Sequence, residues 1–70
     1  MSEKILNLKY IAERRKELGL TQEEMAKKLG MNSAPAYNKY EKGVYKFKAT
    51  AIPTLLDTLN CEVSDIFLLA

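Results

Sequence analysis

Apolar residues recur every three or four positions along most of this chain, which is the spacing that gathers them on one face of an α-helix. The strict alternation of apolar and polar residues that marks a half-buried strand is missing from the pattern. The predicted stripes comprise Leu8, Ile11 and Leu18; Met25, Ala26 and Leu29; Tyr37 and Tyr40; Ile52, Leu55, Leu56 and Leu59; and Val63, Ile66, Phe67 and Leu69. They predict an all-α fold, a compact bundle of five short helices.

One helix start is marked by Thr21. Its hydroxyl can accept a hydrogen bond from a free N–H of the first turn, while Glu24 reaches back to the N–H of Thr21. Gly30 follows this segment and can end the helix in a left-handed conformation, which costs glycine no steric strain. We therefore predict a short helix between Thr21 and Gly30.

A second short helix follows directly. Either Asn32 or Ser33 can cap it, and Pro35 fits only its first turn, because proline lacks the N–H that a helix interior needs. Gly43 supplies the stop. Two short helices joined by a glycine-containing turn form a helix-turn-helix, so we predict this motif at about residues 21–43 and DNA binding as its first interpretation.

The other three helices have boundaries of the same kinds. Asn7 can cap a first helix, which Gly19 ends. Thr50 can cap a fourth, with Pro53 in its first turn. A short last helix would carry the final apolar stripe. Because no repeat, linker or low-complexity segment interrupts the chain, we expect residues 1–70 to form a single domain.

The composition argues against several classes of function. Histidine is absent and Cys61 is the single cysteine, so the common zinc ligands, disulfides and acid–base groups are missing. We expect no enzyme activity, catalytic residue, metal or cofactor. A signal-peptide pattern and an apolar run of about 18 residues are also missing. These features predict a soluble cytoplasmic protein, associated with the nucleoid if it binds DNA.

Charge is spread unevenly along the chain. The net charge is +2, but residues 38–48 hold four lysines and one glutamate, whereas residues 49–70 hold three acidic residues and no basic one. In this lysine segment (residues 38–48), basic and aromatic side chains are interleaved and could follow a phosphate backbone. The lysines are Lys39, Lys42, Lys46 and Lys48. A solvated lysine loop is the alternative, although the position directly after a helix-turn-helix favours contact with phosphate.

Five short motifs occur in a specific order and spacing. They are Arg14, the run GLTQEEMA at 19–26, Leu29 with Gly30, the run YEKG at 40–43 and the run LNCEVSDIF at 59–67. Together they resemble the Cro-type, lambda-repressor-like helix-turn-helix domain of phage and bacterial transcriptional regulators. The resemblance implies a small repressor that binds double-stranded DNA through its third helix, as a homodimer formed through the last helix. No membrane partner is expected, and 70 residues leave no spare segment for a small-molecule pocket.

The resemblance also implies which side chains contact DNA, counting back from Glu41. Alanine can touch a thymine methyl group, and asparagine or lysine can bond base edges. The expected base contacts are Ser33, Ala34, Pro35, Asn38 and Lys39, with Ala36 at a further base-reading position. The expected phosphate contacts are Thr21, Gln22, Lys42, Tyr45, Lys46 and Lys48. For Tyr45, packing as a loop anchor is the alternative.

Two further expectations concern Glu41. Gly30 to Glu41 spans eleven steps, one more than is usual in the family, so we expect a longer turn around residues 32–34 and a late start of the third helix. Arg14 lies on the same side of the first helix as its apolar stripe and would be costly to bury alone. In the family this arginine pairs with the glutamate that ends the recognition-helix segment, here Glu41, so the resemblance implies an ion pair between Arg14 and Glu41. Two separate surface charges are the alternative.

A different class of function remains open. The base-reading set is weak in hydrogen-bonding side chains, the net charge is small, and the chain ends in the apolar run IFLLA at 66–70. These features are also typical of a protein-interaction module that keeps the fold without reading DNA. Salt separates the two interpretations, because binding to phosphate through several lysines weakens steeply with salt and an apolar interface does not.

Overall fold

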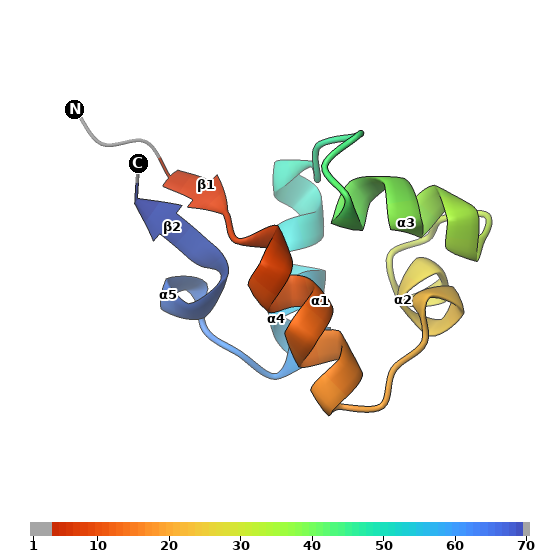
Figure 1. Ribbon diagram of the computed structural model, residues 1–70, viewed down its shortest axis with the longest axis horizontal. Helices are drawn as coiled ribbons and strands as arrows, with labels where there is room; N and C mark the ends of the chain where they lie inside the picture. Colours follow the sequence, from red (N-terminus) through yellow and green to blue (C-terminus); the bar gives the residue numbers. More distant parts are fainter. Residues whose placement is uncertain (1–3, 70) are drawn as a thin grey trace.

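The computed structural model describes residues 4–69. Over this range it contains five α-helices, one 3-10 turn and a pair of short strands (Figure 1), which confirms the predicted all-α bundle. The elements are β1 (Lys4–Leu6), α1 (Leu8–Glu17), α2 (Gln22–Lys28), α3 (Ala34–Glu41), the 3-10 turn η1 (Ala49–Ala51), α4 (Ile52–Leu59), α5 (Val63–Ile66) and β2 (Phe67–Leu69).

The caps predicted around α2 and α3 are formed. The Thr21 hydroxyl accepts from the Glu24 N–H at 3.0 Å, and the Glu24 carboxylate accepts from the Thr21 N–H at 2.9 Å, completing the reciprocal cap that begins α2. Ser33, of the two candidates, caps α3 by accepting from the Ala36 N–H at 3.3 Å. Pro35 lies in the first turn of α3, so α2 and α3 form the predicted motif.

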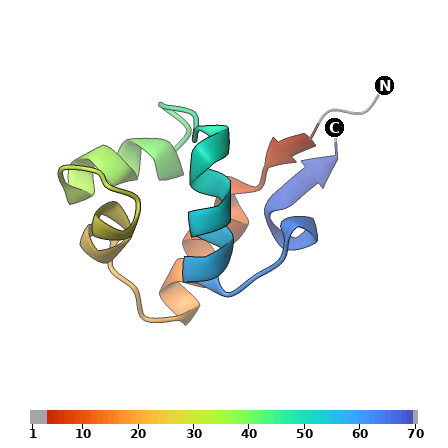
Figure 2. The ribbon, with the colours of Figure 1, turned by 180° about the vertical axis from the view of Figure 1, so that it is seen from behind.

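The core draws on all five helices. Its fully buried side chains are Ile11, Met25, Ala26, Tyr37, Leu55, Leu59 and Ile66. Figure 2 shows η1 and α4 standing between the α2–α3 pair on one side and the strands on the other. Leu18 does not belong to the core as predicted; it is 40% exposed because it lies at the C-cap of α1, beyond the last helical turn that faces the other helices.

The predicted last helix is too long by three residues. α5 ends at Ile66, and Phe67–Leu69 forms β2, which pairs antiparallel with β1. In this register Ile5 faces Leu68 and Leu6 faces Phe67, so the two ends of the described chain lie side by side (Figure 1). The strands are too short to display an alternating pattern, and their pairing joins segments from opposite ends of the sequence. Ala70, the last residue of the predicted apolar terminus, lies outside the described residues.

One prediction about the fourth helix is corrected. Thr50 does not cap the fourth helix, because it lies inside η1 and α4 begins after Ala51 without a side-chain cap. Pro53 does occupy the first turn of α4. Cys61 is half-buried, and burial raises the pKa of its thiol, which keeps it protonated at neutral pH and suits a packing role.

Candidate nucleic-acid interface

α3 buries one face and leaves the other open. Tyr37 is fully buried against the core, whereas Pro35 and Lys39 are exposed and Asn38 is partly exposed. Figure 1 shows α3 along the outer edge of the fold, with α2 below it. A helix placed this way can approach another molecule with its open side.

The predicted base contacts occupy this open side in two turns. Ser33 is the cap, Ala34 and Pro35 form the first turn, and Asn38 and Lys39 follow one turn later. Residues four apart on a helix are neighbours, so Ala34 lies beside Asn38 and Pro35 beside Lys39. The side chains of the first turn are small and project little beyond the backbone.

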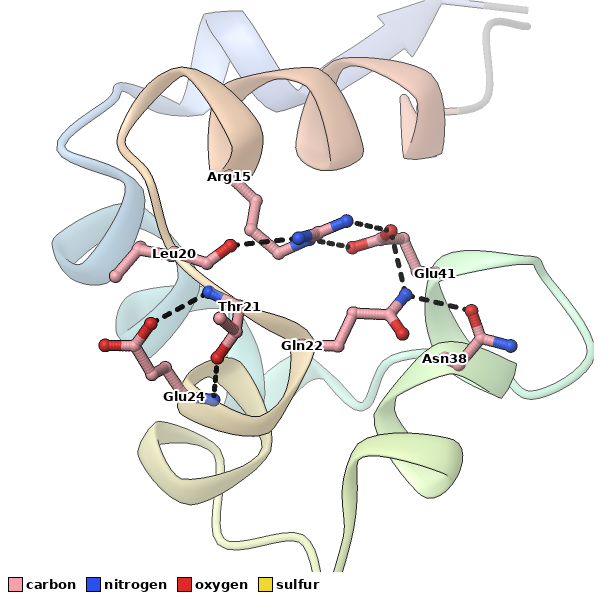
Figure 3. A network of polar contacts seen from close by, with 7 residues as sticks. All are labelled: Arg15, Leu20, Thr21, Gln22, Glu24, Asn38 and Glu41. Atoms are coloured by element: carbon pink, nitrogen blue, oxygen red, sulfur yellow. Dashed lines mark hydrogen bonds and ion pairs between the residues drawn. The ribbon is translucent and has the colours of Figure 1, made fainter.

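Glu41, the last residue of α3, forms an ion pair with Arg15. The Arg15 Nε and one terminal nitrogen donate to the two carboxylate oxygens at 2.9 and 3.1 Å (Figure 3). The two side chains are only 9% and 8% exposed. A two-point contact of this kind fixes orientation as well as distance, so α1 and α3 are held at one relative position.

The predicted partner, Arg14, was wrong by one residue. Its Nε donates to the Leu59 carbonyl at 2.9 Å, and a terminal nitrogen donates to the Asn60 carbonyl at 3.3 Å. Positions three and four beyond Ile11 lie on either side of the same buried line. Arg14 therefore faces the end of α4 and Arg15 faces α3, and spacing along the sequence does not distinguish these two sides.

The charges of the pair stabilise each other. Burial disfavours the ionised form of Glu41, but hydrogen bonds from Arg15 and other donors outweigh that cost, so the pKa of Glu41 lies below its usual value. The hydrogen bond to Glu41 raises the pKa of Arg15 in turn. The remaining terminal nitrogen of Arg15 donates to the Leu20 carbonyl at 2.9 Å, which ties the connection before α2 into the same site.

Tyr37 forms one wall of this site. Its hydroxyl oxygen is enclosed, and among residues 4–69 it has no hydrogen-bond partner of good geometry. Burial, and then the nearby Glu41 carboxylate, raise the pKa of Tyr37. The phenol is thus neutral and packs beside the ion pair, in agreement with its predicted core role.

Gln22 and Asn38 extend the ion pair toward the open side of α3. The Gln22 side-chain nitrogen donates to the Asn38 side-chain oxygen at 2.9 Å and to Glu41 Oε1 at 3.3 Å (Figure 3). The sequence predicted a phosphate contact for Gln22 and a base contact for Asn38, but not that the two side chains touch. Sixteen positions separate them, and no local spacing signals such a contact. We call Arg15, Glu41, Gln22 and Asn38 the polar network.

The lysine segment runs from the end of α3 over packed aromatic rings. The Tyr40 and Tyr45 ring centroids lie 5.5 Å apart in an edge-on arrangement, and Tyr40 also packs on Phe47 at 5.3 Å. The Lys39 ammonium lies 5.5 Å from the centroid of the Tyr45 ring. Tyr45 is nevertheless 49% exposed, so it anchors the loop and still presents part of its surface.

The lysines of this segment are free of ion pairs with any of residues 4–69. Lys39, Lys42, Lys46 and Lys48 are all exposed. Across the described range no group of metal-binding side chains occurs. None of the helices in that range is long and apolar enough to cross a membrane.

The candidate interface consists of the exposed face of α3 and the exposed lysines that follow it.

Comparison with protein families agrees with this geometry. A family model described as helix-turn-helix matches residues 11–66, a range that runs from the core residue of α1 to that of α5. Searches among curated proteins and among solved structures give no match.

Proposed function

The chain belongs to the lambda-repressor-like helix-turn-helix family of DNA-binding regulators, and on that premise we propose that it is a small transcriptional repressor that enters the major groove with α3. The observation that carries this proposal is the open side of α3, held at a fixed angle by the buried Arg15–Glu41 pair and followed directly by exposed lysines. A major groove admits one α-helix, whose outward side chains then meet base edges.

Base contacts come from the open side of α3. Ala34 and Pro35 are small enough to let the helix backbone approach closely, and an alanine methyl can contact a thymine methyl. Asn38 and Lys39 supply hydrogen bonds to base edges, and Ser33 can donate with its hydroxyl while its oxygen caps the helix. Few direct hydrogen bonds to bases are then available, and the rest of the sequence specificity depends on the shape of the DNA.

Phosphate contacts come from both sides of α3. Lys42, Lys46 and Lys48 lie after the helix, where Tyr45 can add a hydroxyl donor. Thr21 lies at the start of α2, on the other side of the motif. Phosphate contacts position the protein on the duplex without reading sequence.

The repressor binds as a two-fold homodimer in this proposal. The last helix, which was expected to form the contact, ends at Ile66 and is followed by the strand pair, on which Ile5 and Leu68 are each 50% exposed and lie opposite one another. We therefore assign the dimer contact to β1 and β2. Two-fold symmetry would place two copies of α3 in half-sites about one helical turn apart.

Salt-dependent binding tests the proposal against the protein-interaction alternative. Fluorescence anisotropy of a labelled random-sequence duplex, followed over about 50 to 200 mM salt, should show steeply weakening affinity. Replacing Lys42, Lys46 and Lys48 by alanine should reduce the slope by about 0.9 for each phosphate that is no longer neutralised. Lys16→Ala, on exposed α1 surface, is the matched control and should leave the slope unchanged. Absent or salt-insensitive binding would favour the protein-interaction module.

A further inference from the structure

We propose that Gln22 is a positioning residue that fixes the polarity of Asn38, so that Asn38 meets DNA as a hydrogen-bond donor and favours a G·C pair. This inference rests on the proposed function and assigns a base preference to one of its residues. It follows from the chain of hydrogen bonds in the polar network, which runs from the buried ion pair through Gln22 to Asn38 on the open side of α3.

The ion pair at the buried end of the network determines which side-chain atoms donate hydrogen bonds and which accept them. An arginine side chain only donates hydrogen bonds and an ionised carboxylate only accepts them. Arg15 binds both Glu41 oxygens, and Glu41 Oε1 also lies 3.3 Å from the terminal atom of Gln22. That atom must therefore be the Gln22 nitrogen, because the amide oxygen would be an acceptor facing an acceptor. The pair thus determines which way the Gln22 amide points.

Gln22 in turn determines which way the Asn38 amide points. Its nitrogen carries two hydrogens, one directed at Glu41 and the other at Asn38 across 2.9 Å. The atom of Asn38 that receives this bond must be its oxygen. Figure 3 shows the Asn38 nitrogen on the side away from Gln22. Asn38 therefore presents two N–H donors outward while its oxygen is held against α2.

The same arrangement changes the role expected of Gln22. Both hydrogens of its side-chain amide are engaged within the protein, and the oxygen that remains is an acceptor. Phosphate oxygens are acceptors too, so they gain nothing from this amide. The predicted phosphate contact of the Gln22 side chain is therefore replaced by a positioning role.

An outward donor distinguishes bases. An asparagine bonds adenine through two points, donating to N7 and accepting from the N6 amino group, and the held oxygen of Asn38 cannot turn to complete that pair. Guanine presents two neighbouring acceptors, N7 and O6, in the major groove. The two N–H groups of Asn38 match them, so G·C is favoured over A·T at the position it meets.

Selection of duplexes from a randomised pool tests this assignment. The wild-type chain, Asn38→Ala, Gln22→Leu and Glu23→Gln are selected in parallel, and circular dichroism confirms that each is helical. Asn38→Ala identifies the position by removing its preference. Gln22→Leu frees the Asn38 oxygen and should shift that position from G·C toward A·T by about tenfold, the size of one good two-point contact. Glu23→Gln, at the exposed neighbouring residue, should leave the base preference unchanged.

The outcomes separate the inference from the proposed function. If the wild-type chain enriches no sequence, the proposed function fails and the inference fails with it. If it enriches a site whose preference at the Asn38 position is unchanged by Gln22→Leu, or is A·T already, the inference alone is overturned.

A measurement on the wild-type protein without DNA covers the case in which Gln22→Leu does not fold. Hydrogen exchange of the side-chain amides, followed by NMR, should be slowed at Gln22, whose hydrogens are bonded, and fast at Asn38, whose hydrogens face outward. Slow exchange at Asn38 with fast exchange at Gln22 would mean the opposite polarity and would overturn the inference.

Discussion

The helix-turn-helix end of the molecule and the terminal end (β1, α5 and β2) are held together by different interactions. At the first, a buried ion pair and its amide neighbours join α1, α2 and α3 through directional bonds. At the second, Ile66 is buried in the core and its carbonyl accepts from the Asn7 N–H at 2.7 Å. No ion pair between described residues occurs there. The first end is thus fixed by side-chain hydrogen bonds that set the angle between helices. The second combines apolar packing with backbone hydrogen bonds, from Asn7 to Ile66 and between β1 and β2.

Breaking the ion pair should have the largest effect on stability. Arg15→Ala leaves Glu41 buried without its partner and should cost about 3 to 5 kcal/mol of unfolding free energy, measured by denaturant unfolding. Arg14→Ala is the matched control and should cost about 1 kcal/mol, because its hydrogen bonds lie at a partly exposed site.

The double variant Arg15→Met, Glu41→Leu sharpens this test. Removing both charges leaves no buried charge without a partner, so most of the lost stability should return. Equal losses for Arg14→Ala and Arg15→Ala, or no recovery in the double variant, would contradict the assigned pair.

At the terminal end, stability should fall when a buried side chain is replaced by a smaller one. Ile66→Ala empties a fully buried position and should cost about 2 to 4 kcal/mol. Val63→Ala, in the same helix but 46% exposed, should change stability by less than about 0.5 kcal/mol. Thermal unfolding of the two variants checks this, and similar melting temperatures for both would show that α5 is not anchored through Ile66.

Acid should weaken the helix-turn-helix end selectively. The pKa of Glu41 is lower in the folded chain than its usual value, so the unfolded chain binds more protons as the pH falls through the carboxylate range. Stability from the pair is then complete above the usual glutamate pKa and is lost as the pH falls through the folded pKa. Glu41→Gln should show a shallower fall in unfolding free energy from about pH 6 to about pH 3 than the wild type.

The control for this acid prediction is Glu13→Gln, which removes a carboxylate from the exposed surface of α1. It should keep the wild-type slope. A slope reduced as much by Glu13→Gln as by Glu41→Gln would mean that total charge, and not the ion pair, governs acid stability.

The smallest expected difference in stability is between replacing Thr21, which caps α2, and replacing Thr50, which was predicted to cap α4 but does not. Thr21→Ala removes the hydroxyl that begins α2 and should cost about 1 kcal/mol. Thr50→Ala removes no cap, since Thr50 lies within η1, and should stay within about 0.5 kcal/mol. Denaturant midpoints of the two variants give the comparison, and a larger loss for Thr50→Ala would revise the start of α4.

The helix boundaries at the helix-turn-helix end could be predicted from the sequence because they depend on interactions between neighbouring residues. The Thr21 cap and the Pro35 position depend on residues within one turn of each other, so spacing alone predicts them. The cap of α3 was narrowed to Asn32 or Ser33, and the bond to Ala36 selects Ser33.

What the sequence did not predict depends on contacts between distant segments. Choosing Arg15 over Arg14 requires knowing which side of α1 faces α3, and the bond from Gln22 to Asn38 requires the crossing of α2 and α3. The strand pair joins residues near the two ends of the chain. None of these leaves a periodic signal, because a helix shows its apolar face in sequence but not the neighbour that each flank meets.

Amide chemical shifts recorded by NMR during a titration with duplex DNA would show which surface of the protein meets the duplex. We expect shifts concentrated at the start of α2, along α3 and through the lysine segment at 38–48, with α5 little changed. Shifts confined to β1, β2 and α5, or none at low salt, would contradict the claim that this helix-turn-helix reads DNA.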